Sequence, residues 1–208
     1  MQMRKSLKAL FPLAAAVLLI GGCRGKPSDP SSSSSAAPLR VWEPDAKLLE
    51  ELGPFTPVDE YQVRPPKAYS LTPPAPNGSG QIRAFYWTGT PREDKTAPYF
   101  LIALVSSPAG EVKEKTLEKE LDELLEGFHR RRSNWTQTSP ERGQVNGMTF
   151  VRSYWSGIDP EKQAKMHGFM YATKDSSTLI HLSSQDVEPH YEHALKVAEA
   201  AVLTFKKK

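Results

Sequence analysis

The feature that most constrains this 208-residue chain is its single cysteine, Cys23. One cysteine cannot form an intramolecular disulfide, and it cannot supply the paired thiolates of the common structural zinc sites. If Cys23 is itself modified, no thiol remains to act as a nucleophile. The fold must therefore be stabilised by the packing of a hydrophobic core, without covalent or metal cross-links through sulfur.

The residues before Cys23 have the layout of a secretory signal. Residues 1–8 carry three basic residues and no acidic one, and residues 9–20 are apolar apart from one proline. This apolar run is shorter than the roughly 20 residues that a membrane-spanning helix needs. We therefore expect residues 1–22 to be a cleaved signal peptide.

The signal ends in Ile20-Gly21-Gly22-Cys23, which resembles the lipobox of bacterial lipoproteins. The resemblance implies that Cys23 becomes the mature N-terminus and carries a diacylglycerol, often with a further chain such as palmitate. Two or more chains give stable membrane anchoring. We expect a cell-envelope protein facing the periplasm or the exterior. Arg24 replaces the aspartate that retains many lipoproteins in the inner membrane, which indicates the outer membrane wherever such sorting operates. The alternative is a soluble secreted protein.

Charge and composition change once residues 1–22 are removed. Three basic residues leave with the signal, so 24 of the 27 remain and balance the 24 acidic residues. A neutral chain has no net electrostatic attraction for nucleic acid or for an anionic membrane. Residues 23–40 are rich in serine and proline and poor in apolar residues, which predicts a flexible tether that spans about 20 Å.

The hydrophobic pattern predicts a lead-in over residues 41–60, with a short helix at 45–52, and then one domain over residues 61–208. The run Tyr99–Val105 (YFLIALV) is apolar throughout and predicts a central strand. Turn residues between the later apolar runs favour antiparallel hairpins. The expected strands are 81–87, 99–105, 135–139, 148–155, 164–173 and 178–183.

Two amphipathic helices are expected. Leucines from residue 117 onward recur at helical spacing, with acidic residues on the other side. The second helix closes the chain, from a predicted N-cap at Asp186, with Pro189 in its first turn, to Phe205. Strands followed by helices in this order predict an α+β fold, a mainly antiparallel sheet with helices packed on it.

This order resembles the PsbP-like superfamily. The residues that carry the resemblance are Arg64-Pro65-Pro66-Lys67-Ala68-Tyr69, Phe85-Tyr86-Trp87-Thr88-Gly89, Gln144–Phe150 with Tyr154-Trp155-Ser156-Gly157, and Thr204-Phe205. They span about residues 61–206. The resemblance implies an α-β-α sandwich and a non-catalytic role in binding or assembly, without naming a partner.

Two aromatic pairs are candidate binding residues. Tyr86-Trp87 and Tyr154-Trp155 are each followed by a small hydroxyl residue and glycine, so they could place aromatic side chains along one rim. The competing interpretation is that members of each pair pack in the core.

Histidines offer a candidate metal site. His190 and His193 are spaced i, i+3, and His167 or His181 could add a third ligand. The sequence has no H-E-x-x-H motif, so the competing interpretation is solvated surface histidines. We expect no metal and no cofactor.

Other motifs point away from catalysis and nucleic acid. Arg130-Arg131-Arg132 is explained by capping the end of the helix, and Asn77-Gly78-Ser79-Gly80 precedes a strand instead of the helix that a phosphate loop needs. The sequence has no G-x-S-x-G or S-x-x-K motif. We expect a lipid-anchored domain that binds or scaffolds another envelope protein. The alternatives are a small-ligand or metal-binding lipoprotein and, third, an envelope hydrolase.

Overall fold

The computed structural model describes residues 38–72, 82–106 and 116–208. The predictions for the signal, for Cys23 and most of the tether, and for the Asn77–Gly80 turn lie outside these residues. Within the described part of the chain, no helix is long and apolar enough to cross a membrane.

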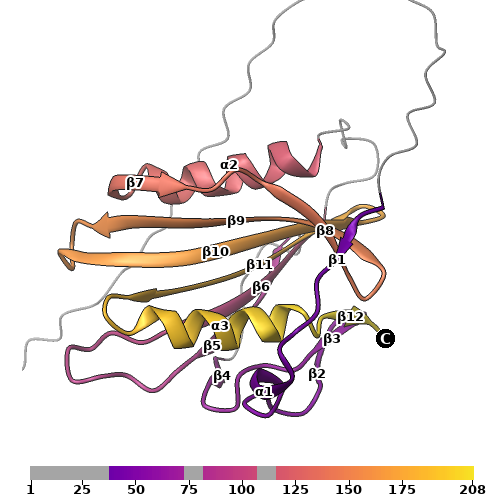
Figure 1. Cartoon of the computed structure of the whole chain (residues 1–208), viewed down its shortest axis with the longest axis horizontal. Helices are drawn as coiled ribbons and strands as arrows, with labels where there is room; N and C mark the ends of the chain where they lie inside the picture. Colours follow the sequence, from indigo (N-terminus) through magenta and orange to yellow (C-terminus); the bar gives the residue numbers. More distant parts are fainter. Residues whose placement is uncertain (1–37, 73–81, 107–115) are drawn as a thin grey trace, which may run out of the picture. The chain divides into compact units, whose positions relative to one another are not determined.

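A nine-stranded sheet forms the centre of the domain (Figure 1). In spatial order its strands are β1 (Arg40–Val41), β8 (Glu141–Val145), β9 (Met148–Asp159), β10 (Ala164–Asp175), β11 (Thr178–Val187), β6 (Tyr99–Ser106), β5 (Ile82–Thr88) and β4 (Ser70–Thr72), while β7 (Ser133–Gln137) also pairs with β9. Only the pairing of β1 with β8 is parallel. A small second sheet joins β12 (Lys206–Lys207), β3 (Tyr61–Val63) and β2 (Thr56–Val58).

Short turns fix the register of the long hairpins. Val145 lies opposite Met148, so β8 and β9 are joined by a two-residue turn, Asn146-Gly147. Both turn residues have positive φ, 47° and 81°. These are the values that a type I′ turn requires, and its twist matches that of the flanking strands. The sequence therefore sets which face each residue of β9 occupies.

Three helices accompany the sheets: α1 (Ala46–Leu49), α2 (Leu117–His129) and α3 (Tyr191–Val202). The side chain of Thr116 caps α2 by accepting from the backbone N–H of Lys119, at 3.4 Å. Leu121 and Leu125 of α2 are fully buried, as the amphipathic spacing predicts. Asp45 caps α1 in the same way.

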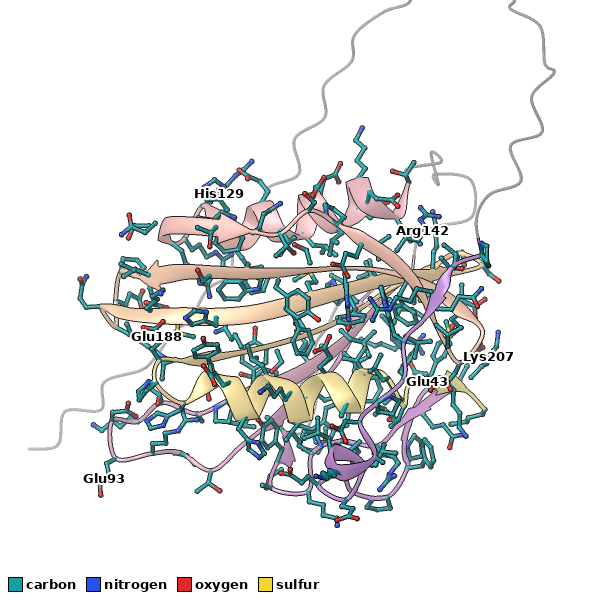
Figure 2. All side chains as sticks on the ribbon, in the orientation of Figure 1. Glu43, Glu93, His129, Arg142, Glu188 and Lys207 are labelled. Atoms are coloured by element: carbon teal, nitrogen blue, oxygen red, sulfur yellow. The ribbon has the colours of Figure 1, made fainter. Side chains whose placement is uncertain are left out.

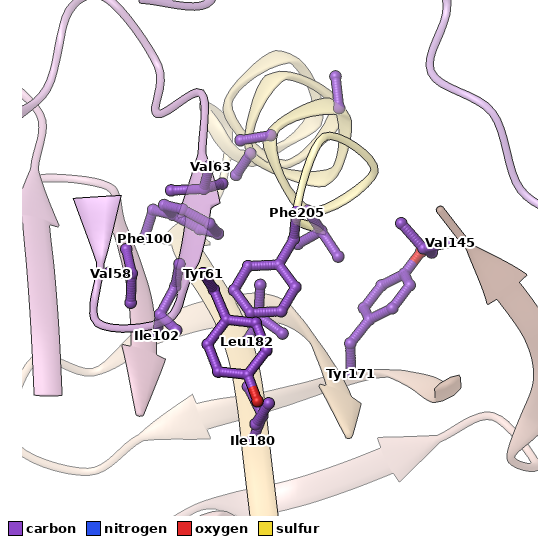
Figure 3. Close-up of a cluster of buried hydrophobic side chains, with 14 of the residues drawn as sticks. Val58, Tyr61, Val63, Phe100, Ile102, Val145, Tyr171, Ile180, Leu182 and Phe205 are labelled. Atoms are coloured by element: carbon purple, nitrogen blue, oxygen red, sulfur yellow. The ribbon is translucent and has the colours of Figure 1, made fainter. Parts of the chain in front are cut away.

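The core is divided between the two faces of the sheet. On the face covered by α3, the α3 face, Phe100, Ile102, Ile180 and Leu182 pack with Phe205 and the small sheet (Figure 3). On the other, the α2 face, residues such as Val151, Met170 and Val187 pack against α2, which contacts β9 and β10. Because side chains alternate along a strand, each long strand feeds both clusters.

The structure confirms most expected elements and corrects some. The strand at 99–105 lies inside the sheet, between β11 and β5, as predicted. Asp186 is not an N-cap: it lies in β11, is 1% exposed, and its carboxylate pairs with Arg92 at 2.5 Å. The closing helix begins later, after His190, which makes no side-chain capping bond. The chain also forms β8, which the polar residues Glu141–Gln144 did not predict.

Candidate binding sites on the two faces of the sheet

A groove of about 240 Å³, which we call the α3 groove, lies between the N-terminal residues 40–48, β9 and α3. Parallel pairing of β1 with β8 places the indole of Trp42 on Gly143, where a Cβ atom would lie only 2.4 Å from the ring. A glycine is therefore required here for Trp42 to form the inner end of the groove. Its volume lies below the range of ligand sites for drug-sized molecules, which measure roughly 300–1,000 Å³.

The floor of the α3 groove is a closed hydrogen-bond network around Glu199. Oε1 of Glu199 accepts from Nη1 of Arg152 at 3.1 Å, from the hydroxyl of Tyr171 at 2.5 Å, and from the hydroxyl of Tyr154. Nη1 of Arg152 also donates to the Tyr171 oxygen at 2.9 Å. One carboxylate from α3 thus joins three side chains of the sheet.

Arg152 is also fixed from its outer side. Its Nε and Nη2 donate to one carboxylate oxygen of Glu141, at 3.1 and 2.9 Å, and its guanidinium lies 4.3 Å from the centre of the Trp42 ring. Only 15% of the Arg152 side chain is exposed. Such a buried arginine is stabilised by having both its charge and its hydrogen-bond donors matched.

These contacts make the floor chemically inert. Burial, followed by the charge of Glu199, raises the pKa of Tyr154 and of Tyr171 above the ordinary tyrosine value. Hydrogen bonds from Arg152 to Tyr171 and Glu141 raise the arginine pKa, against the opposing effect of burial. Neither phenol therefore ionises at neutral pH, and three donors converge on one oxygen of Glu199, Oε1.

At the mouth of the α3 groove, the charged side chains face solvent, unlike Arg152 and Glu199 at its floor. Arg40, Glu43 and Lys196 line it and are solvent-exposed, and Glu43 lies on the segment between β1 and α1 (Figure 2). No hydrogen bond or ion pair joins the side chains of these three residues to another side chain in the part of the chain that the structure describes. The mouth therefore presents two cations and one carboxylate to solvent.

On the α2 face, Trp155 lies in a stack of rings and a cation. Trp135 stacks on it at 5.1 Å between ring centres, Phe128 lies at 5.6 Å, and the Arg132 guanidinium lies 4.6 Å away. Gly168 makes room, because a Cβ there would lie 2.5 Å from the indole. Burial lowers the pKa of Arg132, whose Nη2 donates to Gln185 at 2.9 Å.

Beside this stack, none of the helices that the structure describes packs on the α2 side of the sheet. We call the α2-side surface of β5, β6 and β11 the open face, because α2 packs on β9 and β10 instead. Ile82 and Tyr86 are 40% and 36% exposed there. Leu101, Val105 and Leu179 are half-buried, whereas the central α3-side residues of β6 and β11 are buried: Phe100, Ile102, Leu104, Ile180 and Leu182.

Polar atoms without partners gather on this side of the sheet. Among the described residues, buried side-chain nitrogens without a hydrogen bond on the α2 face are Nε of Arg132, Nε1 of Trp155 and Nδ1 of His181. The hydroxyl of Ser183 has Tyr99 as its neighbour on β6 and hydrogen-bonds to it. Register places His181 and Ser183 on β11 beside Ala103 and Leu101 of β6. Buried polar atoms are normally paired, so this face is incompletely satisfied by the chain itself.

No family model and no curated protein sequence matches this chain. Solved structures do match it. CyanoP, the cyanobacterial PsbP of Synechocystis, matches with a TM-score of 0.52 at 10% identity, over 86% of this chain and 98% of its own. The fold is PsbP-like.

Two further solved structures match with similar scores. LpqN, a protein involved in cell envelope biogenesis of Mycobacterium tuberculosis, has a TM-score of 0.52 at 10% identity and covers 80% of this chain and 97% of its own. The Ran-binding protein Mog1p of Saccharomyces cerevisiae has a TM-score of 0.51 at 11% identity and covers 74% and 96%. At these identities the matches establish the fold, as the sequence resemblance implied, and leave function open.

The PsbP-like sheet separates the predicted aromatic candidates. Trp87 is 2% exposed on the α3 face and Trp155 is 4% exposed on the α2 face, so the two indoles do not form one rim. The shared rim fails because strand register places Trp87 of β5 and Trp155 of β9 on opposite faces, and alternation then puts each neighbouring tyrosine on the other face. Tyr154 joins the Glu199 network, and Tyr86 alone of the four is exposed, on the open face.

The histidines are not brought together. His193 contacts Glu51 at 2.9 Å, and His167 contacts Glu188 at 2.7 Å and stacks on Tyr191. His181 lies on the other face, where burial lowers its pKa to about 4. The described residues contain no group of three or more potential metal ligands. Metal binding by His190 and His193 therefore has no third ligand in this part of the chain.

The arginine run divides its roles. Nε of Arg130 pairs with Glu126 at 2.9 Å on the exposed end of α2, and Nη1 of Arg132 donates to the carbonyl of Phe128 at 3.1 Å. Capping of the helix end is thus observed, as predicted. The packing of Arg132 on Trp155 was not predicted, because it depends on how α2 lies across the sheet.

Three groove residues, Trp42, Arg152 and Glu199, were missed by the sequence reasoning. The available signal was local: Arg152 interrupts the apolar strand Met148–Trp155, and Glu199 interrupts the apolar face of the closing helix. A charge inside an apolar pattern predicts a buried partner, but the sequence does not say that these two residues are partners.

Proposed function

We propose that this chain is a lipid-anchored extracytoplasmic domain that binds or scaffolds another envelope protein and has no catalytic activity. The observation that carries the proposal is the open face of the sheet. It presents Ile82 and Tyr86 to solvent next to half-buried aliphatic residues, in a domain whose other sheet face is sealed by α3.

A protein partner fits the chemistry of the open face. Exposed apolar residues on one surface are typical of protein-binding sites. His181 and Ser183 lie beneath these residues with buried polar atoms. Burial lowers the pKa of His181 to about 4, so it is neutral at neutral pH and docking on this surface desolvates no histidine charge.

The anchor and the fold support placement in the cell envelope. The lipobox-like end of the signal predicts acylation of Cys23, followed by a serine-rich tether to the domain. LpqN, which shares the fold, is involved in cell envelope biogenesis in its own organism. Outer-membrane placement rests on Arg24 and applies where lipoproteins are sorted by that position.

The hydrogen bonds and ion pairs of two carboxylates, Glu199 and Asp186, support a role without catalysis. At the α3 groove, Glu199 is occupied by three donors and the neighbouring phenols have raised pKa values. Asp186 is consumed by its pair with Arg92. These two carboxylates are thus held in structural contacts, which supports a binding role over a catalytic one.

Capture from crosslinked membranes tests this proposal. The full-length chain, an Ile82→Lys variant and a Lys119→Glu control on the exposed side of α2 are expressed, crosslinked in cells and purified. We expect one identified envelope protein to be recovered with the wild type and the control and to be depleted at least fivefold with Ile82→Lys. Equal recovery with all three chains would remove the open face as the docking surface.

A further inference from the structure

The mouth of the α3 groove carries three charges that the fold does not use. Arg40 and Lys196 bring positive charge and Glu43 brings negative charge, and none of the three side chains forms a hydrogen bond or an ion pair with another side chain among residues 38–72, 82–106 and 116–208. Asp45, also in the lining, is different, because its carboxylate caps α1 at 2.8 Å from the N–H of Lys47. The free charges therefore favour a ligand that is itself both anionic and cationic.

The inner part of the groove has a fixed shape and little charge to offer. Arg152 is balanced by Glu141 and Glu199, and its guanidinium is stacked on Trp42. The remaining lining includes Leu48, Ala200 and Leu203. A ligand would thus meet a preorganised apolar and aromatic base beneath a zwitterionic mouth.

Position in the chain identifies a source for such a ligand. Arg40 follows Cys23 by seventeen residues. A flexible segment of that length spans roughly 20–25 Å on average, so a domain anchored at Cys23 stays within reach of the lipid headgroups. Val41, which also lines the groove, is 56% exposed and is the most exposed large apolar side chain among the described residues. An exposed valine beside cations suits contact with a membrane interface.

We propose that the α3 groove binds the headgroup of a zwitterionic phospholipid of the phosphoethanolamine type. The phosphodiester accepts hydrogen bonds from Arg40 and Lys196, and the primary ammonium donates to Glu43. The mature chain is formally neutral, so it would not be drawn to an anionic surface, and pairing with a zwitterion needs no net charge. The cavity of about 240 Å³ matches a headgroup better than a whole lipid.

Weak binding is sufficient for this role. A tethered domain experiences an effective ligand concentration in the millimolar range, so a millimolar affinity already keeps the groove occupied for much of the time. Occupation would orient the domain on its membrane. The proposal relies on the lipid anchoring proposed above only for the supply of ligand, and it is independent of the open face.

The test uses the chain without its signal and with Cys23→Ser, so that no acyl chain holds it to lipid. NMR titration follows the indole N–H of Trp42 while sn-glycero-3-phosphoethanolamine is added, and then while glycerol 3-phosphate or ethanolamine is added alone. We expect a saturable shift with the whole headgroup, with an affinity at least threefold higher than for either half. Lys196→Glu should weaken it at least threefold, and the matched control Lys119→Glu should leave it unchanged.

Vesicles separate a membrane lipid from a free phosphodiester. The same chain should co-sediment with phosphatidylethanolamine-containing vesicles more than with pure phosphatidylcholine vesicles, whose quaternary ammonium has no N–H to donate to Glu43. Glu43→Gln should remove that preference. Three results would each overturn the proposal. They are no saturable shift of the Trp42 indole N–H, the same affinity for Lys196→Glu as for the wild type, and binding of the free headgroup without binding to vesicles. Because this chain is not acylated, these results do not depend on the lipidation of Cys23.

Discussion

Removal of the Glu199 carboxylate should destabilise the domain far more than removal of an exposed glutamate from the same helix. Glu199→Ala deletes the oxygen that accepts from Tyr154, Tyr171 and Arg152. Arg152 keeps its bonds to Glu141, but both phenols lose the acceptor that lies between β9, β10 and α3.

The size of the effect follows from these contacts. A buried hydrogen-bonding group left without its partner costs about 1–3 kcal/mol, and bonds to a charged acceptor lie in the upper part of that range. Two phenols and a weakened arginine site give a loss of about 3–4 kcal/mol in the free energy of unfolding. For a domain of this size, each 1 kcal/mol lowers Tm by about 2–4 °C, so Tm should fall by about 10 °C.

Urea unfolding at pH 7, followed by tryptophan fluorescence, measures the effect. Glu192→Ala, at an exposed position of α3, is the matched control and should change stability by less than about 0.5 kcal/mol. Glu199→Gln keeps one neutral acceptor and should fall between the two. If Glu199→Ala unfolds within 1 kcal/mol of Glu192→Ala, the network does not stabilise the domain and the reasoning is refuted.

Four further substitutions test the fold. Gly143→Ala places a Cβ 2.4 Å from Trp42 and should lower the free energy of unfolding by about 1–3 kcal/mol, measured by thermal unfolding. Gly127→Ala in α2 meets nothing within 4 Å and should raise it by up to about 1 kcal/mol. If both substitutions changed stability in the same direction, the packing of Trp42 on Gly143 would be contradicted. Burial lowers the pKa of His181 to about 4, so between about pH 6.5 and 4 the histidine is protonated in the unfolded state but not in the folded one. The free energy of unfolding should therefore fall by roughly 2–3 kcal/mol over this range. Urea titrations at several pH values should show that His181→Leu lacks this pH dependence. Arg92→Ala leaves a buried carboxylate unpaired and should cost about 3–5 kcal/mol by calorimetry, and a loss under 1 kcal/mol would count against that pair.

Local signals predicted the elements of the fold well. The apolar run at residues 99–105, the leucine spacing after Thr116 and the Asn146-Gly147 turn each act over a few residues, and each has the predicted structure. Asp186 shows the limit. Its position before a helical pattern is typical of an N-cap, but its partner Arg92 lies 94 residues earlier, in a loop whose path no local pattern describes.

The candidate sites were less predictable for the same reason. Trp42, Arg152 and Glu199 are far apart in sequence and meet only when β1 pairs with β8 and α3 packs on β10 and β11. The aromatic pairs were visible in the sequence, but the face on which each ring lies depends on strand register. Alternation along a strand would have separated Tyr86 from Trp87, yet it could not show which face lacks a helix.

The central claim is that the open face docks an envelope protein, and site-specific photocrosslinking in intact cells tests it most directly. A photoreactive residue replaces Tyr86 on the open face of the full-length, lipidated chain, and Lys119 on α2 in a second chain. We predict one discrete crosslinked protein from position 86, reduced by Ile82→Lys, and none from position 119. The same crosslinks from both positions, or none from position 86, would contradict the account.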